Sequence, residues 1–228
     1  MSTRNSIVFC LLFVMFFTGL YETANSQEIE SENVLTELQK RYTVKNLKTN
    51  AVGIPTHIEG DLTPMDAKGD EINVSYAFFE ENKDLFRMNN PRQELIVKKT
   101  KKDDIGMTHV FLKQTYKDVE VYGGELIVHF TSNKRIKSIN GFYEHGIKIS
   151  TIPAVSQQTA ESIAFSDLEN NYGRGDITDT RLMIYDHKGT YYLIWKVMLK
   201  IQIPPGNWEY FIDANSGDIL YKANRIKF

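Results

Sequence analysis

The sequence predicts an α+β protein with two small domains, in each of which a helix packs on a twisted antiparallel sheet. Three observations support this class. Apolar residues recur at helical spacing before about residue 90, strand-like alternation begins near Glu94, and the order of helix followed by strands returns after Pro153. The chain has 228 residues, of which 42% are hydrophobic and 25% charged, which is enough to bury two small cores.

The first 26 residues have the pattern of a signal peptide. After a polar start, an apolar run extends from Ile7 to Tyr21, and small residues at Ala24 and Ser26 suit cleavage after Ser26. An uncleaved membrane anchor is the alternative, but the run is shorter than the roughly 20 residues that a spanning helix needs. We therefore expect a mature chain that is secreted, or periplasmic in a Gram-negative organism, without stable membrane insertion.

Two helices are predicted before the first strands. Leu35, Leu38 and Tyr42 recur at helical spacing and indicate an amphipathic helix over Glu32 to Val44. The stretch from Lys45 to Met65 contains glycines and prolines and should be irregular or short-stranded. A second helix should begin at a cap on Asn73 or Ser75 and carry four large apolar residues on one face. These are Phe78, Phe79, Leu85 and Phe86.

From Glu94 onward the period of the apolar residues changes to two. Leu95 to Val97, Thr108 to Gln114 and Leu126 to Phe130 each alternate as half-buried strands do. Turns are expected at Gly123-Gly124 and at Ser132-Asn133. The first half is therefore predicted to end in an antiparallel meander.

The second half is predicted as one helix followed by four strands. Ser156 should cap a helix whose apolar stripe ends at Gly173. The clearest strand runs from Leu193 to Ile203, with its apolar residues on one face and Lys196 on the other. Turn residues then separate two further strands, at 204–207 and at 215–217.

No residue is predicted to be catalytic, to bind a cofactor or to hold a metal. The five histidines include no His-Glu-x-x-His pair, although His109 and His129 could meet across a sheet, where we expect a structural role. Asp103-Asp104 is expected in a solvated turn, because neighbouring residues on a strand point to opposite faces and cannot share a proton. Trp195 and Trp208 are expected as core partners across two strands.

Composition excludes further function classes. The net charge is −2 and the basic residues look scattered, so no nucleic-acid partner is indicated. The single cysteine, Cys10, lies in the predicted signal peptide, and the mature chain would contain neither a disulfide nor a thiolate.

One stretch resembles a known family closely. The segments Asp104-Ile-Gly-Met-Thr-His109, Gln114-Thr-Tyr116 and Val119-Glu-Val121-Tyr-Gly123-Gly-Glu125-Leu-Ile-Val-His129 are similar to the propeptide domain of fungalysin and thermolysin metalloproteases, called FTP. The second half resembles a PepSY domain at Leu193-Ile-Trp195-Lys-Val197 and at Trp208 to Leu220. After the signal peptide over 1–26, the resemblance implies an FTP-like domain over 27–147 and a PepSY-like domain of cystatin-like type over 148–228.

The resemblance also implies a function without catalysis. In this family the last hairpin leads into a catalytic domain that carries the zinc motif, whereas here the sequence stops at Phe228. We therefore expect no enzyme activity, no cofactor, and action in trans as an inhibitor or folding chaperone of a thermolysin-like zinc metalloprotease. Ile226, Lys227 and Phe228 would enter the substrate cleft, with the terminal carboxylate near the zinc, or would form a frayed tail. The alternatives are a truncated protease precursor and a general extracellular module that binds peptides.

Overall fold

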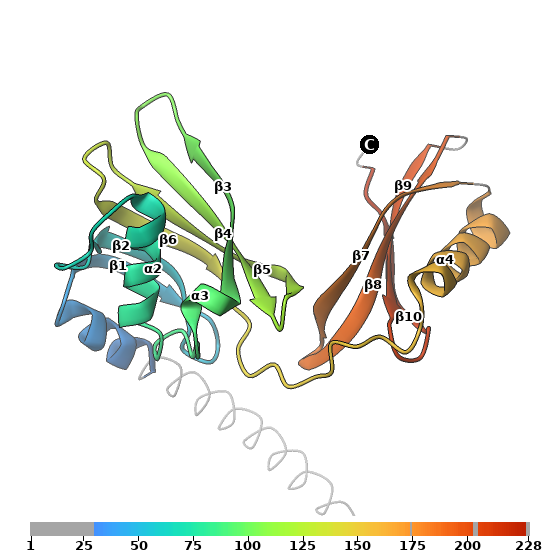
Figure 1. The fold of residues 1–228 in the computed structure, drawn as a ribbon, viewed down its shortest axis with the longest axis horizontal. Helices are drawn as coiled ribbons and strands as arrows, with labels where there is room; N and C mark the ends of the chain where they lie inside the picture. Colours follow the sequence, from blue (N-terminus) through green and yellow to red (C-terminus); the bar gives the residue numbers. More distant parts are fainter. Residues whose placement is uncertain (1–29, 174, 203–204, 227–228) are drawn as a thin grey trace, which may run out of the picture. The chain divides into compact units, whose positions relative to one another are not determined.

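The structure, a computed structural model, describes residues 30–173, 175–202 and 205–226, and the predicted signal peptide lies outside them (Figure 1). It confirms the α+β class, with ten strands and helices on them. The chain divides into two compact units. Unit 1 contains the residues up to Pro91 together with Val97–Phe111 and Leu126–Tyr143, and unit 2 contains Arg92–Ile96, Leu112–Glu125 and the chain from Glu144. The predicted division into domains after residue 147 stays a prediction.

Unit 1 is built on an antiparallel sheet. Strands β1 and β2 pair antiparallel, and β2 pairs in turn with β6, with Ile58 opposite Ile139. Next to β6 comes β5, which also pairs with β4, and β4 pairs with β3. The strand bounds are Thr43–Thr49 for β1, Pro55–Asp61 for β2, Leu95–Lys102 for β3, Thr108–Tyr116 for β4, Val119–Phe130 for β5 and Ile136–Phe142 for β6. Strands β4 and β5 continue from one unit into the other.

Helix α2 (Glu71–Glu81) provides the buried aromatic residues of unit 1. Its N-cap is Asp70, whose side chain accepts a hydrogen bond from the N–H of Asn73 at 2.9 Å, so the predicted cap at Asn73 or Ser75 is wrong by one turn. Phe78 and Phe79 are fully buried. Phe86 joins them at 5.3 Å from the Phe79 ring, but it lies beyond the end of the helix.

Two other elements predicted in the first half of the chain are wrong in extent or place. The first helix ends at residue 39, and Val44 lies instead in β1, because the carbonyl of Leu38 closes the helix through a turn at Tyr42. The predicted turn at Gly123-Gly124 lies inside β5, and the chain turns earlier, at Lys117 and Asp118, which both have positive φ. A short helix, α3 (Pro91–Glu94), precedes β3.

Unit 2 follows the predicted order of helix and four strands. Helix α4 (Gln157–Tyr172) is capped by Ser156, which accepts a hydrogen bond from the N–H of Thr159, and it ends at Gly173, as predicted. Four antiparallel strands then follow in sheet order: β7 (Asp176–His187), β8 (Thr190–Ile201), β9 (Gly206–Asp213) and β10 (Ile219–Asn224). The sheet is not wholly antiparallel, because Val121 at the start of β5 pairs in parallel with Ile184 of β7.

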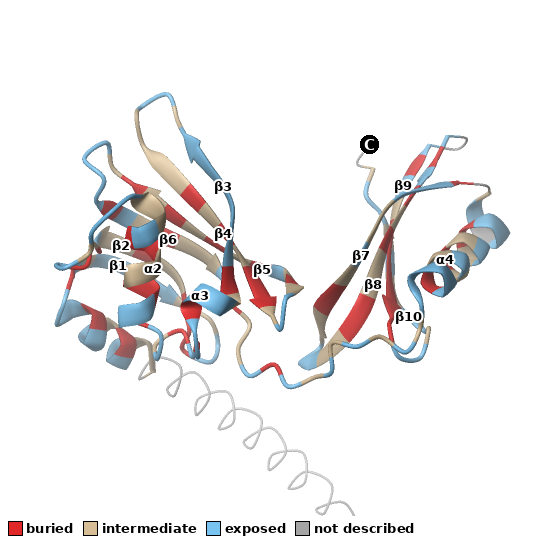
Figure 2. Ribbon diagram, in the orientation of Figure 1, coloured by how far each residue is buried: buried red, intermediate tan, exposed pale blue. Residues whose placement is uncertain are grey.

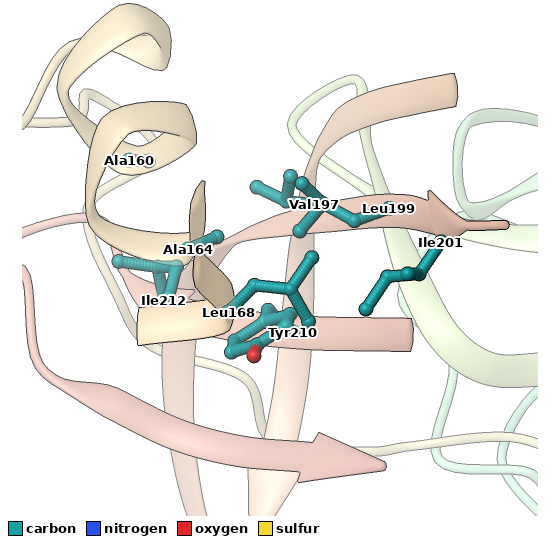
Figure 3. Close-up of a cluster of buried hydrophobic side chains, with 8 residues drawn as sticks. All are labelled: Ala160, Ala164, Leu168, Val197, Leu199, Ile201, Tyr210 and Ile212. Carbon is teal, nitrogen blue, oxygen red and sulfur yellow. The ribbon is translucent and has the colours of Figure 1, made fainter. Parts of the chain in front are cut away.

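The core of unit 2 lies between α4 and one face of this sheet. Both β8 and β9 contain buried positions, as Figure 2 shows by colour. These positions alternate in β8 from Val197 to Ile201, whereas in β9 every residue from Glu209 to Asp213 is buried. Small residues on α4 let the helix approach the strands closely, and larger side chains of the strands fill the space between them. The buried cluster consists of Ala160, Ala164, Leu168, Val197, Leu199, Ile201, Tyr210 and Ile212 (Figure 3). None of the helices in the described part of the chain is long and apolar enough to cross a membrane.

Candidate functional site

The predicted partner-binding tail begins at the end of β10. Of its three residues only Ile226 is described, while Lys227 and Phe228 lie outside the described residues. Ile226 is half-buried and donates its N–H to Oδ1 of Asn224 at 3.1 Å. The same Oδ1 accepts the N–H of Asn207, and the N–H of Arg225 donates to the carbonyl of Asn207 at 2.7 Å. The start of the tail is therefore held along β9.

A hollow lies beside this segment. Its volume is about 490 Å³, and Ile226 forms part of its wall together with residues at the ends of β8 and β9. The wall residues besides Ile226 include Thr178, Lys200, Ile201, Pro205 and Asn207. The hollow combines apolar side chains with one lysine, and no group in it is placed for acid or base chemistry.

A buried ion cluster fixes the residue before Ile226. The side chain of Glu209 is 5% exposed, and each of its oxygens meets a cation. Oε1 lies 3.1 Å from Nζ of Lys196, and Oε2 accepts hydrogen bonds from Nε of Arg225 at 2.7 Å and from its Nη2. The hydrogen bond to Glu209 raises the pKa of the Arg225 guanidinium. A forked contact of this kind sets the direction of the arginine as well as its position.

Aromatic rings surround the ion cluster on the sheet face opposite α4. Phe211 is buried, and its ring lies 4.7 Å from those of Tyr122 and Tyr185 and 5.0 Å from that of Tyr221. Nη2 of Arg225 also reaches the hydroxyl of Tyr122 at 3.3 Å. Partial burial raises the pKa of Tyr122 and Tyr185, so their hydroxyls stay neutral. This face presents tyrosine rings whose hydroxyl groups can form hydrogen bonds, which suits binding of a polypeptide better than catalysis.

His109 and His129, which the sequence indicates could meet across a sheet, are in contact in unit 1. Nδ1 of His109 lies 2.7 Å from Nδ1 of His129, and Nε2 of His109 lies 3.1 Å from Oδ2 of Asp103. Burial lowers the pKa of His129, and the neighbouring His109, His57 and Lys137 lower it further. The pair can therefore share one proton in a row that ends on a carboxylate.

Asp103 has more partners than the predicted solvated turn would give it. Its Oδ1 accepts the N–H groups of Ile105 and Met107, at 3.1 and 2.8 Å. Partial burial opposes ionisation, but these hydrogen bonds and the one from His109 together lower the pKa of Asp103. The carboxylate thus holds the turn between β3 and β4. Among the described residues, no group of three or more His, Cys, Asp or Glu side chains could hold a metal ion.

Two residues of the FTP-like stretch form a clamp in unit 2. Gln114 is buried, and its amide both donates to the carbonyl of Glu144 at 2.6 Å and accepts the N–H of Glu144 at 2.8 Å. Gly124 leaves the room for this amide, since a Cβ at Gly124 would lie 2.7 Å from Oε1 of Gln114. The pattern of Gln and Gly therefore serves packing, and it fixes the start of the connector before α4.

The two tryptophans pack on the α4 face of the sheet without pairing directly. In the register of β8 and β9, Trp195 lies opposite Ile212 and Trp208 opposite Leu199. Nε1 of Trp195 donates to the carbonyl of Val155 at 2.8 Å. Both rings border the same buried cluster, so the expected core role is confirmed, while the expected direct pairing is wrong.

Sequence reasoning misses the ion cluster of Lys196, Glu209 and Arg225. It places Lys196 on the polar face of its strand, which is correct, and attaches no role to the other two residues. A charged residue at alternating spacing in a strand normally lies in solvent. Only the register of β8 and β9, together with the return of the chain after β10, shows that Glu209 is buried between two cations.

Comparison with known proteins relates the chain to metalloprotease propeptides. Residues 93–143 match the Fungalysin/Thermolysin Propeptide Motif (FTP). A bacillolysin of Brevibacillus brevis is 30% identical over 183 residues, which cover 75% of this chain and 34% of that protein. Neutral protease B of Bacillus subtilis is 33% identical over 159 residues, covering 66% and 30%. A bacillolysin of Bacillus cereus is 27% identical over 94% of this chain and 38% of its own length.

The chain thus spans about one third of the length of the curated relatives that it matches. A solved structure, the C-terminal domain of Bacillus megaterium YpeB, aligns with a TM-score of 0.40 and 14% identity, over 76% of this chain and 73% of that one. The resemblance to the thermolysin and fungalysin propeptide is confirmed. The match falls on the propeptide and not on the catalytic domain.

Proposed function

From this resemblance to the propeptide of thermolysin-family metalloproteases, we propose that the protein is secreted, is not an enzyme, and acts in trans on a thermolysin-like zinc metalloprotease. It would inhibit that protease, assist its folding, or do both. The observation that carries the proposal is the propeptide match over residues 93–143, which in this chain form β3, β4, β5 and β6. Residues 1–26, with the pattern of a signal peptide, support the proposed secretion.

The polar residues of the matched stretch favour a binding role for a rigid sheet. Gln114 fixes the backbone at Glu144, and Asp103 with His109 fixes the turn between β3 and β4. Each of these groups is engaged in holding backbone or another side chain. A surface that is ordered before it meets its partner loses little conformational entropy on binding. That property suits both an inhibitor and a template for folding.

The tail Ile226 to Phe228 is the contact that we propose for the substrate cleft of the protease. The Arg225 fork on Glu209 supports this assignment, because it holds the backbone one residue before the tail. An extended segment anchored at one end can lie along a cleft at a smaller entropic cost than a free tail. The neighbouring face with Tyr122, Tyr185 and Tyr221 offers further contact area to the body of the protease.

The proposal is tested with purified protein that carries residues 27–228. We expect saturable inhibition of a thermolysin-like protease from the same organism, and weaker inhibition by a variant that lacks residues 226–228. Arg225→Gln should weaken inhibition in the same direction while the tail stays present. Glu169→Gln, on the exposed side of α4, removes one charge far from the tail in sequence and serves as the control.

A second measurement separates the two actions. The denatured protease is refolded with and without the protein, and the recovered activity is compared after dilution. Recovery without inhibition supports a chaperone, and inhibition without recovery supports an inhibitor. If neither occurs, action in trans on this class of protease is ruled out.

A further inference from the structure

Strand β3 is more exposed than β4, the strand with which it pairs. It pairs with β4 and, within the described part of the chain, with no other strand. Every residue of β3 after Leu95 is exposed, and Figure 2 shows the strand in the colour of exposed residues. An edge strand carries a row of backbone N–H and C=O groups that a further strand can pair with. The part that lies in unit 1, Val97–Lys102, is called the β3 edge below.

The β3 edge also concentrates positive charge. Four of its six residues are lysines, although the chain as a whole has a net charge of −2. Because side chains alternate along a strand, Lys98 and Lys102 lie on one side of the sheet and Lys99 and Lys101 on the other. Nζ of Lys99 lies 4.5 Å above the ring of Phe111 on β4. The expectation of scattered basic residues is therefore wrong for this segment, because four lysines that are close together in the sequence line both sides of one open edge.

The other edges of the two units differ from this one. Strand β1 has two irregularities in its pairing with β2, next to Asn46 and Thr49, and β10 has one after Ile219. Both strands also contain half-buried as well as exposed residues. Bulges bend a strand and interrupt its pattern of donors and acceptors, which protects an edge from further pairing.

Lysines on an edge strand cause two copies of the same edge to repel each other. The same charges attract a strand of opposite sign, since oppositely charged residues stabilise neighbouring strands and like charges destabilise them. Four lysines within six residues therefore select against a second copy of this chain and in favour of an acidic strand.

We propose that the β3 edge binds an extended acidic segment of a partner protein by strand addition. The segment would pair with the backbone of Val97–Lys102 over about six residues, or roughly 20 Å at 3.3 Å per residue. Acidic side chains at successive positions would point to alternate sides and meet Lys98 and Lys102 on one side, and Lys99 and Lys101 on the other. A flat anionic surface could reach the lysines of only one side at a time.

The test uses a synthetic peptide, acetyl-Glu-Glu-Thr-Glu-Glu-Val-amide with a fluorescent label, and the protein that carries residues 27–228. We expect saturable binding by fluorescence anisotropy that weakens as NaCl is raised, because the lysines are exposed. Lys101→Gln with Lys102→Gln should weaken binding about fivefold. The matched pair Lys45→Gln with Lys48→Gln on β1 should leave binding unchanged, and circular dichroism checks that both variants fold.

A second peptide separates strand addition from simple charge attraction. The same sequence with an N-methyl group on every peptide nitrogen between its residues keeps every charge but loses these donors on both edges. We expect its binding to fall at least tenfold. Equal binding of the two peptides, or no binding of either, would overturn the proposal. Binding to vesicles of phosphatidylglycerol and phosphatidylcholine without binding to the peptide would assign the lysines to a lipid surface and would overturn it as well.

This inference is independent of the proposed action on a protease. Its experiments contain no protease, and its variants leave residues 225–228 unchanged. Loss of peptide binding with intact inhibition would refute the role of the β3 edge alone, and the opposite result would refute the action on the protease alone.

Discussion

Replacement of Glu209 by glutamine should destabilise unit 2 and release the start of the tail. The substitution keeps the size of the side chain and removes its charge. In the native protein Glu209 is 5% exposed and lies between Lys196 and Arg225. Without the carboxylate, two cations face each other across a neutral amide that can accept through one oxygen only. Arg225 then has no counter-charge in this cluster.

The expected loss follows from the exposure of the three side chains. Removing one partner of a fully buried ion pair costs about 3–5 kcal/mol, because the remaining charge is left uncompensated. Here the cations keep some contact with water, since Lys196 is 21% exposed and Arg225 42% exposed. Partial solvation reduces the penalty. We therefore expect a fall of about 2 kcal/mol in the free energy of unfolding.

Urea unfolding followed by tryptophan fluorescence measures this loss where it occurs. Both tryptophans, Trp195 and Trp208, lie in unit 2 and border its buried cluster, so their emission reports on this unit. With a slope of about 2 kcal/mol per molar urea, a loss of this size lowers the unfolding midpoint by about 1 M. Adding Arg225→Gln to the variant should restore part of the stability, because it removes the uncompensated charge.

The control is Glu169→Gln, which removes the same charge from an exposed position of α4 and should change stability by less than about 0.5 kcal/mol. If Glu209→Gln has an effect as small as that of the control, the ion cluster does not stabilise unit 2. If the double variant with Arg225→Gln is no more stable than Glu209→Gln alone, the account of an uncompensated charge is wrong.

Three further changes have defined outcomes. Gly124→Ala should lower thermal stability by about 1–3 kcal/mol in a calorimetric scan, because the new Cβ would lie 2.7 Å from Oε1 of Gln114. Stability against urea should fall as the pH drops below 6.5, because burial lowers the pKa of His129 in the folded protein and the unfolded chain takes up the proton first. His129→Gln should flatten this pH dependence, and an equal slope in the variant would contradict the role of His129. Ser156→Ala should cost about 1 kcal/mol of unfolding free energy by circular dichroism, because the N–H of Thr159 loses its acceptor at 3.1 Å.

Local signals in the chain are sufficient to locate most elements of the fold. The helix from Ser156 to Gly173 is predicted correctly at both ends, because a capping hydroxyl and a terminal glycine act within one turn of the helix. The strand predicted from Leu193 to Ile203 is β8, which begins earlier, at Thr190, and ends at Ile201. Its two faces are predicted, because alternation along a strand does not depend on the arrangement of the neighbouring strands. Prediction errors arise where the role of a residue depends on contact with a residue outside its own local segment. Gly124 has the pattern of a turn, but it is a glycine because Gln114 occupies the space beside it.

The candidate site depends on tertiary structure more than the helices and strands do. The meeting of His109 and His129 can be anticipated from two strands, but their link to Asp103 cannot, because it needs the geometry of the turn. The four lysines between Lys98 and Lys102 are close together in the sequence, a pattern that is also typical of a solvated surface segment. Only the position of β3 at the edge of its sheet indicates that they flank an open strand edge.

The α+β class, the packing of helix on strands in each core and the resemblance to a protease propeptide all follow from the amino-acid sequence. These properties depend on periodicity and on short motifs, which are local in the chain. Three others come from the folded chain: Glu209 is buried between Lys196 and Arg225, Gln114 clamps Glu144, and β3 keeps an open basic edge. They depend on strand order and register, and the two sets of side-chain contacts join residues between 13 and 30 positions apart. Local periodicity contains no information about such pairings.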